Sequence, residues 1–97
     1  MNVFAISKPN KVKEKYMTKK NIKKLIIKCL EEINIYIDDF SENEELSNYI
    51  IDSFQFISFL VSIENIFEIE IKDEELLYEN FATFKDVILF IENEKSK

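Results

Sequence analysis

The feature that most constrains the fold is an apolar run at residues 54–67 that follows the period of an α-helix. Its main stripe consists of Phe56, Phe59, Leu60, Ile63 and Phe67. A second, offset stripe consists of Phe54, Ile57 and Val61. A surface helix of a small domain needs only one apolar stripe. The second stripe therefore predicts either a central helix or a helix that exposes apolar side chains to a partner.

Two further helices are predicted from the same period on either side of this run. The earlier helix spans residues 19–35, with Thr18 as its N-cap. Its apolar stripe consists of Ile22, Leu25, Ile26, Cys29, Leu30 and Ile33. The later helix opens at Thr83 and Asp86, which form a variant of the capping box. Its stripe consists of Phe84, Val87, Ile88 and Ile91, and residues 92–97 are expected to fray.

The segment between the first two helices, residues 36–52, has no sustained apolar period. A loop of this length is uncommon in a compact domain and is often functional. Its acidic residues lack the spacing and the glycine of a calcium-binding loop. The side chains expected to pin the loop to the core are Ile37, Phe40, Leu46, Tyr49 and Ile51.

The connection after the central helix is short and acidic. Residues 69–71 alternate as in a strand, but no second strand is available to pair with them, so we expect an extended connector. Residues 73–78 predict a short helical turn with acids at its start, where they favour the helix dipole. The predicted fold is all-α: a small four-helix bundle, with three main helices plus one short helix and a long loop between helices 1 and 2.

The composition excludes several classes of catalytic site. The chain has no His and no Gly, and Cys29 is its one cysteine. A histidine base or triad, a zinc or iron–sulfur site of the usual ligands, and a glycine-rich phosphate loop are therefore excluded. A single cysteine forms no intrachain disulfide, which fits a reducing cytosol. We expect a cytoplasmic protein in which Cys29 is a small core residue rather than a reactive thiol.

Charge divides the chain into two parts. Residues 1–30 hold nine lysines and one acid, whereas residues 31–97 hold four lysines and eighteen acids. There is no arginine, and most of the lysines of the first part precede any strong apolar pattern, so nucleic-acid binding is not expected. Neither a secretory signal nor a membrane span is expected. We expect residues 1–16 to be a basic, disordered extension and residues 17–97 to be the folded domain, a monomer.

The most informative short motif is Asp52-Ser53-Phe54, where the long loop meets the apolar helix. A serine at such a junction is usually an N-cap, and Asp52 could cap equally well. The functional alternative is a hydroxyl that serves as a covalent attachment point. Free backbone N–H groups and the helix dipole stabilise an anion such as a phosphodiester there. No base in this chain could activate Ser53, so a separate enzyme would have to modify it.

The run Tyr-Ile-Ile-Asp-Ser-Phe at residues 49–54 resembles the acyl and peptidyl carrier proteins, whose hallmark is Asp-Ser-Leu or Asp-Ser-Phe at the start of the second helix. Residues 63–75 are similar to the acidic end of that helix and the connector that follows it in the family. Residues 79–87 are similar to the start of the family's last helix. The resemblance covers about residues 18–93 and agrees with the predicted order of helices and with the acidic balance.

The resemblance implies a specific function without catalysis. Ser53 would receive 4′-phosphopantetheine from coenzyme A through a phosphopantetheinyl transferase that uses Mg²⁺ and recognises the motif with Asp52. The thiol of the arm would then carry an acyl or aminoacyl group as a thioester and present it to enzymes. The positions that match the family's surface for partner enzymes are Phe54, Ile57, Val61 and Glu64.

Departures from the family pattern point to a subtype. Tyr49 and Ile50 stand where the family often has Gly, and Lys72 stands at the usual Pro. The outer face of the central helix offers Gln55, Ser58 and Ser62, where fatty-acid carriers place acids that basic partners read. The motif and the Ile-Glu-Asn-x-Phe run look closer to D-alanyl and stand-alone aminoacyl carriers. An AMP-forming acyl or aminoacyl ligase and downstream acyl-transfer enzymes are then the expected partners.

Two alternatives remain open. The first is a housekeeping carrier of fatty acid biosynthesis, which differs in cargo rather than in chemistry. The second is a small helical protein-interaction module without a prosthetic group, in which Asp52 and Ser53 only cap the helix and the second stripe is the docking face. All three share one fold, so the fold does not distinguish them.

Overall fold

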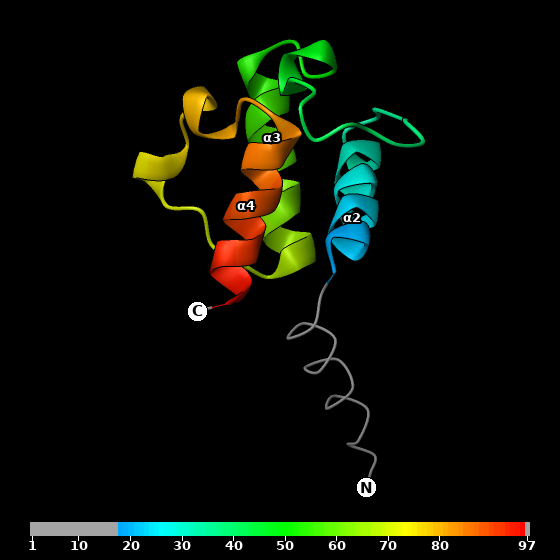
Figure 1. Ribbon diagram of the computed structural model, residues 1–97. Coiled ribbons are helices and arrows are strands. Elements are labelled where there is room, and N and C mark those ends of the chain that lie inside the picture. The colour runs from blue at the N-terminus through cyan, green and yellow to red at the C-terminus, as the bar shows by residue number, and fades with distance from the viewer. Residues whose placement is uncertain (1–17, 97) are drawn as a thin grey trace, which may run out of the picture.

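Figure 1 shows the computed structural model of the chain, which describes residues 18–96. Its α-helices are α2 (Lys19–Glu32), α3 (Ser53–Phe67) and α4 (Phe84–Lys95). Shorter 3₁₀ helices in the connections are η1 (Leu46–Asn48), η2 (Asp73–Glu75) and η3 (Tyr78–Phe81). No strand occurs in residues 18–96, which contain one isolated β-bridge, between Glu45 and Thr83. The all-α prediction is confirmed, whereas the predicted short fourth helix is a pair of 3₁₀ helices.

The three α-helices enclose one apolar core, to which α3 contributes from the centre. Helix α2 packs against α3 and also contacts α4, and α4 packs against η3. In the view of Figure 1, α4 lies in front of α3, and α2 stands to one side of them. Within residues 18–96, no helix is both long enough and apolar enough to cross a bilayer. The predicted extension, residues 1–16, lies outside the described residues.

Helix α2 begins as predicted and ends three residues early. The Thr18 side chain caps its start by accepting a hydrogen bond from the Asn21 N–H at 3.2 Å. The chain leaves the helix at Asn34, whose φ of 67° is left-handed. Its N–H donates to the Glu31 carbonyl, and the Ile35 N–H donates to the Leu30 carbonyl, each at 2.9 Å. This is the Schellman arrangement, with Asn in the place that Gly usually takes.

Helix α3 confirms the main apolar stripe, because all five of its predicted core residues are buried. The helix ends at Phe67 and is followed by Glu68, whose φ of 57° is also left-handed. The Ile69 N–H donates to the Glu64 carbonyl at 3.1 Å, which closes the helix end. Since the chain contains no Gly, a glutamate with a Cβ takes up this backbone conformation.

The long loop is tied to the start of α4 by backbone hydrogen bonds. The Leu46 N–H donates to the Ala82 carbonyl at 2.9 Å, and the Phe84 N–H donates to the Glu44 carbonyl at 3.1 Å. Phe40 stacks on Phe84 with ring centroids 4.0 Å apart. Of the predicted loop anchors, Phe40 and Leu46 are buried, and Ile37 and Tyr49 are partly buried.

The prediction that Ile51 also anchors the loop is wrong, because this side chain is 81% exposed and Ile50 is buried in its place. The reason is the 3₁₀ helix η1, after which the Ile50 N–H donates to the Leu46 carbonyl at 2.8 Å. That bond turns Ile50 inward and leaves its neighbour outside. A segment without apolar period contains no signal for this choice.

The connector after α3 is extended, as predicted, and forms no strand. Ile71 is buried, and its N–H donates to Glu64 Oε2 at 2.8 Å. Lys72 has a φ of −75°, within the range that proline fixes, so the backbone keeps this conformation without proline. The acids Asp73, Glu74 and Glu75 then form the first turn of η2, as predicted.

Helix α4 opens at the predicted capping box. The Thr83 N–H donates to Asp86 Oδ2 at 3.1 Å, and the Asp86 N–H donates to Thr83 Oγ1 at 3.2 Å. The four residues of its predicted stripe are all buried. The expectation of fraying from residue 92 is wrong for residues 92–95, because the helix runs to Lys95 and the Ser96 N–H donates to the Glu92 carbonyl at 3.1 Å.

We predict that Glu68→Gly stabilises the protein, because glycine adopts a left-handed φ without the crowding that a Cβ causes. The expected gain in the free energy of unfolding is roughly 0.5–1 kcal/mol. Thermal unfolding checks it as a rise of a few degrees in the midpoint. Glu70→Gly is the matched control, since Glu70 is exposed, lies two residues on, and has no positive φ. A stabilisation equal to that of the control would contradict the prediction.

Candidate functional site

Asp52, not Ser53, is the N-cap of α3. Asp52 has extended backbone angles, and its Oδ1 accepts a hydrogen bond from the Gln55 N–H at 2.8 Å. The Gln55 side chain reaches back, and its Oε1 accepts from the Ile51 N–H at 3.0 Å. Ser53 is the first residue inside the helix. Of the two capping alternatives raised by the sequence, the structure therefore selects Asp52.

Ser53 is exposed, and no hydrogen bond to another residue of the described range engages its hydroxyl. The backbone N–H groups of Ser53 and Phe54 also lack partners within residues 18–96, as is usual in the first turn of a helix. The first turn of α3 contains no acid to compete for these donors. An anion bonded to Ser53 Oγ would meet the positive end of the helix dipole, so a phosphodiester fits here.

A small hollow of about 270 Å³ lies beside Ser53. It is lined by Ser47, Ile50, Ile51, Asp52, Ser53, Phe56 and Tyr78. The rings of Phe56 and Tyr78 lie 5.6 Å apart and form part of its wall. Its volume is just below the range of about 300–1,000 Å³ that is usual for small-molecule sites. The hollow therefore has room for a short apolar group beside the serine.

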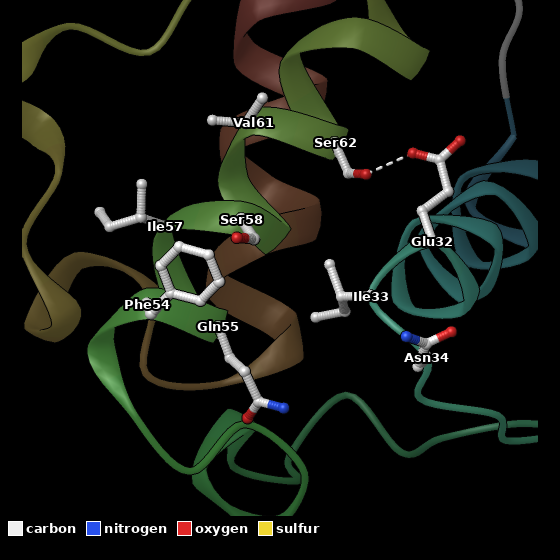
Figure 2. Close-up of a pocket in the computed structure, with 9 residues that line it drawn as sticks. All are labelled: Glu32, Ile33, Asn34, Phe54, Gln55, Ile57, Ser58, Val61 and Ser62. Atoms are coloured by element: carbon white, nitrogen blue, oxygen red, sulfur yellow. Dashed lines mark hydrogen bonds between the residues drawn. The ribbon is translucent and has the colours of Figure 1, made fainter.

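The second stripe of α3 is exposed, as one of the two sequence interpretations requires. Phe54 is 80% exposed, Ile57 40% and Val61 46%. Together with residues from the end of α2, these side chains line a groove of about 600 Å³ (Figure 2). The other lining residues are Glu32, Ile33, Asn34, Gln55, Ser58 and Ser62.

Glu64 does not lie among the residues that line this groove. It is half-buried, and its Oε2 holds the connector through the Ile71 N–H. The structure thus brings Phe54, Ile57 and Val61 together and sets Glu64 apart from them.

The groove contains three residues that the search for a site in the sequence missed: Glu32, Ile33 and Asn34. They lie at the end of α2, about 18 to 20 positions before Asp52. Ser62 is buried, and its hydroxyl donates to Glu32 Oε1 across the gap between the two helices, as Figure 2 shows. Only the packing of α2 against α3 brings these residues to the site, and no local pattern signals it.

The one cysteine of the chain lies in the core, away from the motif. Cys29 is buried, and desolvation, with a smaller contribution from Glu32, raises its pKa to about 12. Its thiol is therefore not a nucleophile near neutral pH, which confirms its place in the core. Within the described range, no group of three or more His, Cys, Asp or Glu side chains could hold a metal ion.

Tyr49 fixes the loop just before the motif. Its hydroxyl donates to Glu44 Oε2 at 2.6 Å, and this hydrogen bond is the main cause of a raised Tyr49 pKa. The ring also lies against Phe84, with centroids 6.0 Å apart. Tyr49 has a φ of −124°, so the backbone passes this position without the positive φ for which glycine is suited.

A family model described as "PP-binding: Phosphopantetheine attachment site" matches residues 23–91, which include Asp52, Ser53 and the groove. The domain of this family is the attachment site of covalent 4′-phosphopantetheine, and carrier domains of this kind are not themselves catalytic. The comparison with curated proteins found no match, and neither did the comparison with solved structures.

The capping assignment predicts unequal effects on stability from two neighbouring substitutions. Asp52→Ala removes the acceptor of the Gln55 N–H and should lower the free energy of unfolding by about 1 kcal/mol. Ser53→Ala removes a hydroxyl without a partner and should change it by less than about 0.5 kcal/mol. Urea unfolding of both variants measures the difference. A larger loss from Ser53→Ala would show that serine, not aspartate, caps the helix.

Proposed function

Since this chain belongs to the phosphopantetheine attachment site family, we propose that Ser53 carries the 4′-phosphopantetheine arm and that the protein is a carrier of acyl or aminoacyl groups. The observation that most supports Ser53 is its exposed, unbonded hydroxyl at the positive end of α3, while Asp52 caps the helix. In the attachment step the Ser53 oxygen forms a phosphodiester bond and adenosine 3′,5′-bisphosphate leaves coenzyme A. The hydroxyl proton goes to a base of the transferase, because this chain has no histidine.

When bound, the arm supplies a thiol that holds the cargo as a thioester. The residues of this chain position the arm and present it. The first-turn N–H groups of Ser53 and Phe54 face the phosphodiester, and Asp52 serves the transferase as a recognition element. The docking surface proposed for partner enzymes consists of Phe54, Ile57 and Val61. Glu64, which holds the connector, lies apart from it.

We further propose that the cargo is an aminoacyl group, D-alanyl among the candidates, loaded by an AMP-forming ligase in the cytoplasm. The half of α3 next to the motif exposes Gln55 and Ser58 rather than acids, so a partner docks through apolar contact more than through charge steering. The hollow beside Ser53 is small, and large Phe side chains fill the core behind it. The small hollow favours a short cargo over the long chain of a housekeeping fatty-acid carrier. The scarcity of acids favours partners other than those that read an acidic helix.

We predict that a promiscuous phosphopantetheinyl transferase with coenzyme A and Mg²⁺ adds one phosphopantetheine mass to the protein and none to Ser53→Ala. Intact-mass spectrometry measures both. The modified protein should also gain one thiol that reacts quickly with a thiol reagent, while Cys29 reacts only after unfolding. Ser41→Ala is the matched control, because Ser41 is exposed and lines neither the groove nor the hollow, and it should be modified like the wild type.

Two results would contradict the carrier function or its site. If the wild type stays unmodified while a known carrier is loaded in the same tube, the helical interaction module becomes the better interpretation. If Ser53→Ala is still modified, the attachment residue is another serine. Efficient loading by a fatty-acid synthase transacylase, with none by adenylating ligases, would instead reject the aminoacyl cargo.

Substituting an exposed residue of the docking surface should weaken recognition by the transferase without lowering the stability of the fold. Ile57→Ser should lower the kcat/KM of the transferase reaction by roughly fivefold or more, because the few residues that dominate an interface each cost more than about 1 kcal/mol when truncated. Leu89→Ser is the control, since Leu89 is about equally exposed but lies on α4, away from the motif. Equal rates for the two variants would place the docking surface elsewhere.

A further inference from the structure

The groove between α2 and α3 differs in character from the small hollow on the other side of the motif. Its walls combine the apolar side chains of the second stripe and Ile33 with polar groups from both helices. One end begins at Phe54 and Gln55, next to Ser53, and the other is formed by Glu32 and Ser62 (Figure 2). A group that leaves Ser53 and follows α3 therefore runs over apolar side chains toward a carboxylate.

The carboxylate of Glu32 is held in place but not neutralised. Ser62 is 7% exposed and donates its hydroxyl to Glu32 Oε1, which fixes the rotamer of the glutamate. Lys19 pairs with Glu42 and Lys23 pairs with Asp39, and no lysine within residues 18–96 forms an ion pair with Glu32. The negative charge at this end of the groove is thus available to a cation.

The end of α2 adds to this negative potential. Its last turn contains Glu31 and Glu32 and no basic residue. A helix C-terminus is the negative end of the helix dipole, where cations are favourable and acids are not. Two glutamates at this position lower the stability of the helix slightly, and a cation placed in the groove would relieve that cost.

The arm is long enough to reach this end. Ser62 lies nine residues after Ser53, which corresponds to about 14 Å along the helix. The backbone of the arm, from phosphorus to sulfur, is about as long as four extended residues, roughly 14 Å. The thiol of a nearly extended arm therefore comes level with Ser62, and a cargo on it reaches Glu32.

We propose that this groove holds the aminoacyl cargo itself, with the arm laid along α3 and the free ammonium of the amino acid paired with the Glu32 carboxylate. This inference rests on the proposed function and names its substrate class: a small amino acid with a free amino group. Phe54, Ile57 and Val61 contact the arm, and Ser62 positions Glu32. A neutral acyl group cannot form an ion pair with Glu32, so it binds instead in the apolar hollow lined by Ile50 and Tyr78.

The test compares two cargoes of equal shape on the full chain. The arm is installed with a transferase from synthetic coenzyme A analogues that carry alanyl or isobutyryl groups through a stable amide in place of the thioester. The two differ by an ammonium in place of a methyl group. We expect the alanyl form alone to shift the backbone amide signals of residues 32–34, Ser58 and Ser62 in ¹H–¹⁵N spectra, and these shifts to shrink in 1 M salt.

Glu32→Gln removes the charge while its side-chain oxygen can still accept from Ser62. It should lower the groove-bound population of the alanyl form by roughly two- to fivefold, the effect of one exposed ion pair. Glu31→Gln is the matched control, because it removes a charge from the same turn without lining the groove, and it should change the population little. Equal shifts from both cargoes, equal effects of both variants, or alanyl-specific shifts at Ile50 and Tyr78 instead would overturn the proposal.

Intact-mass spectrometry distinguishes a failure of the proposed carrier function from a failure of the groove assignment. If the protein accepts no arm on Ser53, the carrier function is wrong and the groove loses its occupant with it. If the arm is present in full by mass and the groove signals do not respond to the ammonium, the carrier function stands and the assignment of the groove is wrong.

Discussion

The hydrogen bond from the Gln55 N–H to Asp52 fixes the residue at which α3 begins, and the geometry of the site depends on that register. Moving the start by one residue would rotate each side chain by about 100° relative to the cap. With the start at Ser53, the serine is in the first turn, the five core positions are buried, and Phe54 is exposed. One capping interaction therefore ties the exposed hydroxyl, the buried stripe and the groove to one another.

The loop before the motif is positioned by backbone bonds and ring packing rather than by its charges. Lys23 lowers the pKa of Asp39 through a side-chain hydrogen bond, but Asp39 is exposed, and surface ion pairs of this kind contribute little to stability. Phe40 and Phe84, which stack on each other, are both buried. Backbone hydrogen bonds also join the loop to the start of α4. These contacts hold η1, which in turn sets the path of the chain into Asp52.

Sequence periodicity predicted the parts of the fold whose cause is local. The main stripes of α3 and α4 and the caps Thr18 and Thr83 follow from helix geometry alone and are confirmed. For the second stripe of α3 the sequence left two arrangements open, and the structure shows the exposed one. The burial of Ile50 and the early end of α2 depend on backbone hydrogen bonds, in segments where the sequence has no apolar periodicity to predict them. Glu32 joins the groove only through helix packing, so no reading of the motif could include it. The attachment role of Ser53 stays a prediction, since geometry permits it without demonstrating it.

The two hollows near Ser53 lie within reach of one flexible arm, so cargo chemistry decides between them more than size does. The larger groove would accommodate a neutral chain by volume, yet it places a carboxylate and several polar groups around that chain, and burying unpaired polar groups is costly. The smaller hollow is apolar and holds no unpaired charge apart from Asp52, whose Oδ1 already accepts from the Gln55 N–H. An ammonium reverses the balance in the groove, because it pairs with Glu32 there. The one carboxylate that lines the hollow, Asp52, already caps α3 and lies next to the proposed phosphodiester. The charges of the two helices then have different roles. The scarcity of acids on the first turns of α3 reduces charge steering of partner enzymes. The unpaired carboxylate of Glu32 at the end of α2 binds a charged cargo.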